Sequence, residues 1–215
     1  MIERILTDGV AAAEVLGDDP SASLLPDEEQ LVAKAVEKRR REVTIARTCA
    51  RRALTELGRS WTAILSGPKR EPLWPEGIVG SITHCKDYCA AAVAEHDKVL
   101  TVGIDAEPAG ALPTGVLDQV SSAGERDLLR ELPGDETWDR LLFSAKESVY
   151  KAWFPLTGRW LGFEDAFITI DAESRSFRAD LLVDPPTVSG VALNGFDGWF
   201  LFERGLVISA ISVPV

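Results

Sequence analysis

The sequence has little cysteine and no long apolar run. Its 215 residues include 3 cysteines, an odd set that is too sparse for a disulfide framework in a chain of this size. No apolar run approaches the length that spans a membrane, and the first residues carry acids instead of a basic region that leads into an apolar one. We therefore expect a cytoplasmic protein with no secretory signal and no membrane partner.

Basic residues are also scarce relative to acidic ones. The chain has 23 Lys and Arg against 34 Asp and Glu, a formal net charge of −11, and a sequence pI of about 4.7. Such a surface as a whole repels nucleic acid and anionic lipid, so we expect no nucleic-acid partner. An anionic ligand would have to meet a local basic patch. The hydrophobic fraction of 46% is enough to fill a core.

The first half of the chain is expected to hold a helix followed by strands. A helical pattern begins after Pro26 and runs, as one helix or two in tandem, to Leu57, with arginines concentrated in its middle. A loop rich in Gly and Pro follows over residues 67–77 and carries Lys69 and Arg70. Strands are then expected near residues 79–83, at 88–95 and at 99–106.

The second half repeats this order. Residues 108–115 are rich in Gly and Pro and are expected to form a mobile loop. From Trp138, apolar residues recur at helical intervals until Pro155, which is expected to stop the helix, and three or more strands follow. The order of helix and then strands thus occurs once in each half, and two similar α+β lobes packed together would account for it.

Two acidic residues stand one residue apart at the end of an apolar strand, in the stretch VGIDAEP. Alternate side chains of a strand share a face, so Asp105 and Glu107 point the same way while Ile104 and Ala106 occupy the other face. Like charges this close repel each other unless a cation lies between them, and oxygen ligands at this spacing suit Mg²⁺. A solvated strand end is the alternative interpretation of the pair alone.

A third carboxylate lies on the helix that begins at Trp138. Arg140, Phe143, Glu147 and Lys151 form a narrow stripe opposite its apolar face. Glu147 and Lys151 could simply be a solvent-facing ion pair, but large aromatic residues crowd this helix more than they do most surface helices. Three acids and the nearby cations together predict a Mg²⁺ site for phosphoryl transfer. The chain has no Walker loop and no kinase signature, so the ligand need not be a nucleoside triphosphate.

His84 lies at the expected end of a strand, close to Cys85 and Cys89. A structural histidine and a zinc ligand are both open from the residues alone. The spacing fits no standard zinc pattern, because Cys49 lies in the first helix and only His96 remains as a further ligand. We therefore expect the thiols to lie in the core or in the wall of a site.

Three motifs, taken together, resemble those of the 4′-phosphopantetheinyl transferases of the surfactin-synthetase-activating type, and the mycobacterial branch in particular. The family's G-K-x-P loop resembles GPKREP at residues 67–72, its G-I-D-x-E strand resembles residues 103–107, and its K-E-x-x-x-K helix resembles KESVYK at residues 146–151. The similarity covers residues from about Leu24 to the end. The family's S-H-S triplet appears here as Thr83-His84-Cys85, which keeps the histidine and changes its neighbours.

The resemblance implies an α+β fold of two similar α/β lobes in a pseudo-twofold arrangement, residues 1–106 and 107–215, with coenzyme A in the cleft between them. The reaction would move phosphopantetheine from coenzyme A to a serine of an apo acyl or peptidyl carrier protein and release adenosine 3′,5′-bisphosphate. It would activate fatty-acid, polyketide or nonribosomal peptide synthases, including those that make siderophores. We expect a monomer.

The resemblance also implies roles for individual residues. The magnesium positions would be Asp105, Ala106, Glu107 and Glu147, and Mn²⁺ is a possible substitute. Glu147, or a water that it orients, would be the base for the carrier serine. The remaining expected contacts are to coenzyme A: Lys146 and Lys151 to phosphate, His84 with Thr83 beside it to the 3′-phosphate or pyrophosphate, and Arg39, Arg47, Lys69 and Arg70 to the nucleotide end.

Two other functions remain open from the sequence. One is a non-catalytic module that binds coenzyme A or carrier proteins, although a pure binder has no need of three metal carboxylates. The other is a Mg²⁺-dependent pyrophosphate hydrolase, in which water replaces the serine. The acidic charge raises a further question, since carrier proteins are usually acidic too. A basic or apolar docking strip near the arginine-rich helix and the 108–115 loop would answer it.

Overall fold

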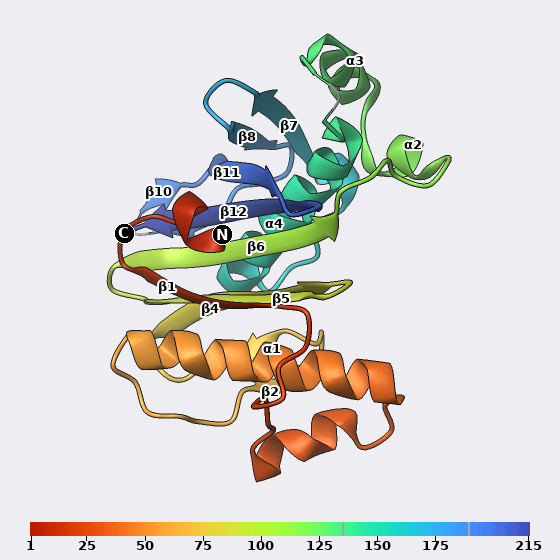
Figure 1. The fold of residues 1–215 in the computed structure, drawn as a ribbon. Coiled ribbons are helices and arrows are strands. Elements are labelled where there is room, and N and C mark those ends of the chain that lie inside the picture. The colour runs from red at the N-terminus through yellow and green to blue at the C-terminus, as the bar shows by residue number, and fades with distance from the viewer. Residues whose placement is uncertain (135, 189) are drawn as a thin grey trace.

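Two antiparallel sheets and two long helices organise the chain in the computed structural model, which describes residues 1–134, 136–188 and 190–215 (Figure 1). The first sheet has the strand order β1-β5-β4 and the second β6-β12-β11-β8-β7. The strands of the first sheet are β1 (Val10–Leu16), β4 (Ile78–Cys85) and β5 (Tyr88–Glu95). The strands of the second are β6 (Val99–Pro108), β7 (Ala166–Asp171), β8 (Ser176–Leu181), β11 (Gly195–Glu203) and β12 (Leu206–Pro214).

The long helices each cover one sheet. Helix α1 (Glu37–Glu56) packs on β5 and β1, and α4 (Trp138–Thr157) packs on β6 and β12. The shorter elements surround this frame. They are η1 (Ile2–Ile5), η2 (Pro26–Val32), β2 (Leu65–Ser66), β3 (Pro72–Leu73), α2 (Val116–Val120), α3 (Ala123–Glu131), η3 (Phe163–Asp165), β9 (Thr187–Val188) and β10 (Val191–Ala192).

Strand β5 shows why the core is layered. Its residues are almost all buried, and they alternate between two apolar clusters. Ala91 and Val93 face α1, whereas Ala90, Ala92 and Ala94 face the second sheet. A strand buried on both faces has a nearly continuous apolar sequence, and small side chains let the two sheets approach closely. A third cluster lies between α4 and the second sheet.

Strand β6 lies at the junction of the two sheets. Its backbone pairs with β12, in register Asp105 to Ser209 and Glu107 to Val207. On its other side, hydroxyl groups of β4 accept hydrogen bonds from its backbone N–H groups. Ser81 Oγ accepts from Ile104 N at 3.1 Å, and Thr83 Oγ1 accepts from Ala106 N at 3.0 Å. These side-chain bonds satisfy buried backbone donors where strand pairing ends. They also fix the strand that carries the acid pair against the first sheet.

Most expected elements are present, with one correction. The strand over 88–95 has the predicted bounds, and the first helical region is indeed a tandem of η2 and α1. Helix α4, however, does not stop at Pro155. It continues to Thr157 and ends at Gly158, which has the left-handed φ of 63°. Proline only removes one hydrogen bond here, in the last turn, so the helix end is set by the glycine.

Candidate functional site

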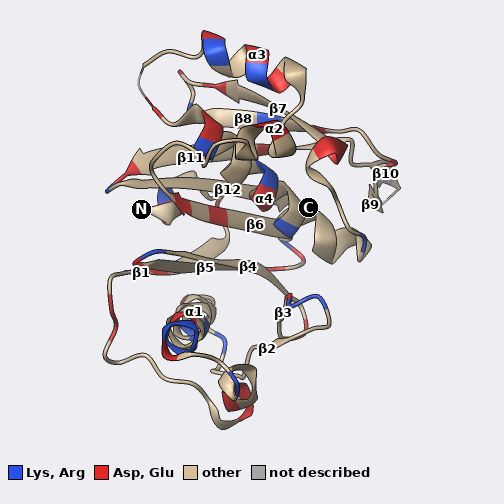
Figure 2. Ribbon diagram, turned by 90° about the vertical axis from the view of Figure 1, so that its right-hand side faces the viewer, with Lys and Arg blue, Asp and Glu red and all other residues tan. Residues whose placement is uncertain are grey.

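The acid pair lies where β6 meets α4 (Figure 2). As the strand period predicts, Asp105 and Glu107 share the face toward α4, while Val102, Ile104 and Ala106 are buried in the cluster between the sheets. Asp105 is 5% exposed. A carboxylate this deeply buried requires a partner of opposite charge.

Gly103 explains how the helix comes so close to the strand. A Cβ at this position would lie 2.1 Å from the backbone oxygen of Ser148 and 2.8 Å from the backbone nitrogen of Ala152. Beside it, Thr101 Oγ1 donates to the Ala152 oxygen at 2.8 Å. Only glycine permits this approach. The glycine of the GIDAE stretch therefore positions the two carboxylates that follow it beside the polar stripe of α4.

The stripe of α4 supplies cations to both acids. Lys151 Nζ donates to Asp105 Oδ1 at 2.7 Å and to the Ile104 backbone oxygen at 3.0 Å. Arg140 Nη1 donates to a Glu107 oxygen at 3.1 Å. Each carboxylate of the pair thus has its own cation, which keeps like charges tolerable at this distance.

Asp105 is electrostatically coupled to both other acids. Burial raises the pKa of Glu107 above its ordinary value, Asp105 adds to this rise, and Arg140 and Lys151 oppose it. Burial also raises the pKa of Glu147; Lys151 opposes that rise and Asp105 adds to it. Asp105 is therefore the central carboxylate of the three.

The oxygen atoms around Asp105 suit a divalent cation in part. Among the described residues, no group of three or more His, Cys, Asp or Glu side chains is gathered as a metal-binding cluster. Yet Asp105 Oδ2 is buried and has no hydrogen-bond partner. A buried carboxylate oxygen without a donor is an oxygen that a hard cation satisfies. The donors fit Mg²⁺ in their chemistry and in the coupling of their charges, although they do not form a closed shell.

Four of the predicted nucleotide contacts line one cavity of about 640 Å³ between α1 and the β2–β3 turn. These residues are Arg39, Arg47, Arg70 and His84. Arg39 Nη1 lies 2.6 Å from His84 Nε2, and Arg47 Nη2 donates to Ser66 Oγ at 2.9 Å. Burial lowers the pKa of His84, and the Arg39 charge lowers it further. A neutral histidine beside arginines, together with a buried Arg47 Nε that has no partner, makes this cavity suitable for an anion.

A second cavity, of about 530 Å³, adjoins the first and reaches Glu147, whereas Asp105 and Glu107 are not among its lining residues. Lys69 and Arg70 line one side of it, and Glu147 and Lys151 line the other. Arg70, Pro72 and Ile82 line both cavities, so the two are neighbours. The combined space extends from the arginines of α1 to the polar stripe of α4.

Two residues that were predicted to contact coenzyme A have partners within the fold instead. Lys146 is 4% exposed, and its ammonium group donates to Glu125 and to the backbone oxygens of Phe163 and Ala166, which uses its three donors. It therefore has no donor for a phosphate. Thr83 is 3% exposed, and its hydroxyl bonds to Asp105 Oδ1 and to the backbone of β6. Sequence spacing placed both beside the site, but each side chain is turned into the packing behind it.

Arg140 is the site residue to which the sequence analysis gave no role. It was found in the stripe of α4, but an arginine followed directly by Leu141, Leu142 and Phe143 carries no sequence signal of its partner. Its partner, Glu107, lies near the end of β6, and only the tertiary structure brings that strand end beside α4. The thiols are as expected: Cys49 and Cys89 are buried, Cys85 is partly buried, and burial raises the pKa of Cys85 to about 12, so it stays protonated.

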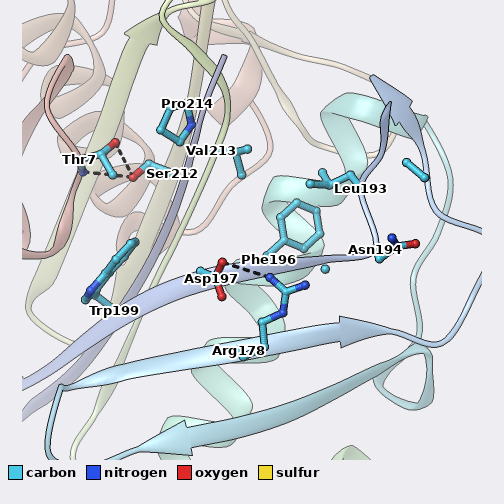
Figure 3. A pocket seen from close by; sticks show the side chains of 12 residues that line it. Thr7, Arg178, Leu193, Asn194, Phe196, Asp197, Trp199, Ser212, Val213 and Pro214 are labelled. Atoms are coloured by element: carbon cyan, nitrogen blue, oxygen red, sulfur yellow. Dashed lines mark hydrogen bonds and ion pairs between the residues drawn. The ribbon is translucent and has the colours of Figure 1, made fainter. Parts of the chain in front are cut away.

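A third hollow, of about 400 Å³, lies over β11 and β12 and contains none of the predicted site residues (Figure 3). Its polar groups are paired with one another: Arg178 Nη1 donates to Asp197 at 3.1 Å, and Thr7 Oγ1 donates to Ser212 Oγ at 2.9 Å. Phe196 and Trp199 add apolar surface. Among the described residues that line it, no charged groups converge as they do at the acid site.

Comparisons with known proteins agree with this geometry. The family model of the 4′-phosphopantetheinyl transferase N-terminal domain matches residues 27–94, and that of the 4′-phosphopantetheinyl transferase superfamily matches residues 101–191. The chain is 50% identical to the 4′-phosphopantetheinyl transferase PptT of Mycobacterium tuberculosis over 209 residues, which cover 95% of this chain and 92% of that protein.

Two further relatives are similarly close. The 4′-phosphopantetheinyl transferase Npt of Nocardia iowensis is 49% identical over 99% of both chains. The 4′-phosphopantetheinyl transferase Svp of Streptomyces mobaraensis is 49% identical over 91% of this chain and 81% of that protein. Within the described residues, no helix is both long enough and apolar enough to cross a bilayer.

Proposed function

The chain belongs to the 4′-phosphopantetheinyl transferase superfamily, and we propose that it carries out transfer from coenzyme A to carrier proteins at the site between β6 and α4. The observation that carries this placement is that the arginine-lined cavity adjoins a second cavity lined by Glu147 and Lys151, and that Lys151 is paired with Asp105. A substrate with phosphates at one end and a reactive pyrophosphate further along matches such a space.

The cations support one orientation of coenzyme A. Arg39, Arg47 and His84 would hold the 3′-phosphate and nucleotide end in the larger cavity. Lys69 and Arg70 would meet the pyrophosphate where the two cavities adjoin, and Lys151 would face it from α4. This orientation directs the pantetheine arm past Glu147.

Glu147 is the proposed general base. It lines the smaller cavity and its pKa is raised by burial, so it accepts a proton more readily than an exposed glutamate. It would take the proton of the carrier serine, directly or through a water, as the serine oxygen attacks the phosphorus. The bond from that phosphorus to the bridging oxygen breaks, and adenosine 3′,5′-bisphosphate leaves with that oxygen.

We propose that Mg²⁺ binds at Asp105, Ala106, Glu107 and Glu147, with Mn²⁺ as a substitute. The unpartnered Asp105 Oδ2 and the coupling of Asp105 to the other two acids support this assignment. The ion would supply charge neutralisation on the pyrophosphate oxygens. Lys151 Nζ forms an ion pair with Asp105 Oδ1 at 2.7 Å, which offsets part of the negative charge at the site.

A repeated ion pair supports the pseudo-twofold arrangement of two lobes. In the first half, buried Glu28 accepts from Leu25 N, Ile64 N and Arg51 of α1. In the second half, buried Glu125 accepts from Ser122 N, Ile168 N and Lys146 of α4. Each acid caps a short helix and binds both the long helix and the segment after it. The division into residues 1–106 and 107–215 stays a prediction, and its line falls within β6, whose backbone pairs with β12.

The remaining expectations stay proposals. A monomer is supported by the fact that both elements of the acid site come from one chain. The net charge of −11 supports the absence of a nucleic-acid or membrane partner. A cytoplasmic location would give the enzyme access to coenzyme A and to carrier proteins of fatty-acid, polyketide or nonribosomal peptide synthases.

The direct test is to mix the protein with Mg²⁺, coenzyme A and an apo acyl carrier protein, and to weigh the carrier by mass spectrometry. A gain of one phosphopantetheine group is the expected result. Release of adenosine 3′,5′-bisphosphate with an unmodified carrier would instead identify a hydrolase. Unchanged coenzyme A and carrier would identify a binding module.

A further inference from the structure

Arg140 connects three parts of the molecule through one guanidinium group. Its Nη1 donates to Glu107 at 3.1 Å, its Nε to the Gly110 backbone oxygen at 3.0 Å, and its Nη2 to the Ala111 backbone oxygen at 2.9 Å. The planar fork of an arginine places such donors at fixed angles to one another. The positions of the carboxylate and of the two carbonyl groups are therefore linked.

The preceding residue of α4 holds the same segment. Asp139 Oδ2 accepts from Leu112 N at 2.7 Å, and its Oδ1 accepts from Arg140 N at 2.8 Å. The segment that follows β6 is thus tied to the first turn of α4 by two successive side chains. It was expected to be mobile from its Gly and Pro content, yet its backbone groups have specific partners.

Glu107 is the acid that most needs this partner. It lies two residues from Asp105 on the same face of β6, and Arg140 Nη1 donates to its carboxylate at 3.1 Å. Arg140 and Glu107 are only 17% and 22% exposed, so water screens their pair less than it would a surface pair. Without the guanidinium, Glu107 would lose both its charge partner and its fixed orientation.

We propose that Arg140 is a positioning residue that couples the order of residues 110–112 to the orientation of Glu107, and hence to the affinity of the acid site for a divalent cation. The coupling is reciprocal, because a cation that fixes Glu107 also fixes the arginine and the segment it holds. Gly110 and Leu112 are partly exposed and Ala111 is exposed, so a carrier protein that touches this segment would change the acid site. This inference rests on the proposed function, in which Glu107 is a metal ligand.

The test uses Mn²⁺ as the probe, with binding measured by electron paramagnetic resonance and loop order by amide hydrogen exchange over residues 108–116. In the wild type, Mn²⁺ is expected to slow exchange in this segment. Arg140→Met removes every donor at similar volume, so the segment should exchange faster, Mn²⁺ should bind about tenfold more weakly or worse, and the protection should no longer respond to the ion.

Two further variants separate positioning from general instability. Arg140→Lys keeps the charge but not the fork, so it should recover part of the Mn²⁺ affinity and little of the loop protection. Asp139→Ala loosens Leu112 without touching Glu107, and coupling predicts a smaller loss of Mn²⁺ affinity in it than in Arg140→Met. Unchanged exchange in α1 shows that each variant is folded.

The outcomes distinguish this inference from the proposed function. Wild-type Mn²⁺ affinity in Arg140→Met, or protection by Mn²⁺ in that variant equal to the wild type, would overturn the role of Arg140 alone. A wild type that does not bind Mn²⁺ would overturn the metal assignment and this inference together. Transfer to a carrier protein is measured separately and is decided by the mass of the carrier.

Discussion

Lys146→Met should unfold far more easily than the wild type while its KM for coenzyme A stays near the wild-type value. The structure places Lys146 in a buried ion pair with Glu125, whose side chains are 3% and 1% exposed, and not in the phosphate cavity. Removal of one partner leaves the Glu125 carboxylate buried with only the N–H groups of Ser122 and Ile168. Breaking a buried pair in this way costs about 3–5 kcal/mol.

A loss of this size is a large fraction of the stability of a typical domain, which is about 5–15 kcal/mol. Urea denaturation at 25 °C measures it as a lower midpoint with an unchanged slope. The double variant Lys146→Met/Glu125→Gln removes the stranded charge but keeps an acceptor for Ile168 N. It should therefore be less destabilised than Lys146→Met alone, and measuring the single variant Glu125→Gln as well completes the cycle that gives the coupling energy of the pair.

Lys151→Met is the matched control, since Lys151 is the other lysine of the KESVYK stretch and is 25% exposed. Its KM for coenzyme A should rise, unlike that of Lys146→Met, while its stability should also fall because the buried Asp105 carboxylate loses its partner. A stability loss below about 1 kcal/mol for Lys146→Met, together with a raised KM for coenzyme A, would refute the structural assignment.

Three other outcomes are expected. Asp105→Ala should abolish transfer with the fold intact, and wild-type turnover in it would remove the metal assignment. Glu147→Gln should lower kcat/KM by about a hundredfold or more, because it weakens proton acceptance. Since burial raises the pKa of Glu147, wild-type activity should fall as the pH drops through a value above that of an ordinary glutamate, and a profile without this acidic limb would contradict the base assignment. Gly103→Ala should lower the unfolding free energy by about 1–3 kcal/mol or more, because its methyl group meets the α4 backbone, and a wild-type urea midpoint would contradict that contact.

The sequence predicts those features that depend on local period. Strand alternation places Asp105 and Glu107 on one face, and the helical repeat places Glu147 and Lys151 on one stripe. Both predictions hold because each needs only the geometry of a single element. The positions of the two elements relative to each other come from tertiary packing, and the spacing of the motifs alone does not give them.

The partner of Lys146 could not be predicted from the helical period alone. Lys146 follows the helical repeat as well as Glu147 does, but a step of one residue turns the side chain about 100° around the axis. That rotation points Lys146 away from the cavity and into the core, where it forms an ion pair with Glu125 of α3. Charged residues next to an active-site motif are commonly read as ligands, and a buried partner distant in sequence gives no local signal.

The same kind of ion pair occurs in both halves of the chain, which supports the proposed pseudo-twofold arrangement. The anchoring cation is Arg51 in α1 and Lys146 in α4, and each binds a buried helix-capping glutamate. The next residue along the helix differs: Arg52 in α1 forms an ion pair with Asp19, whereas Glu147 in α4 lines the cavity on the same side as Lys151. The anchor fixes the rotation of each long helix, so the position that follows it points in a defined direction. In the second half that direction leads to β6, and a carboxylate there completes the acid site.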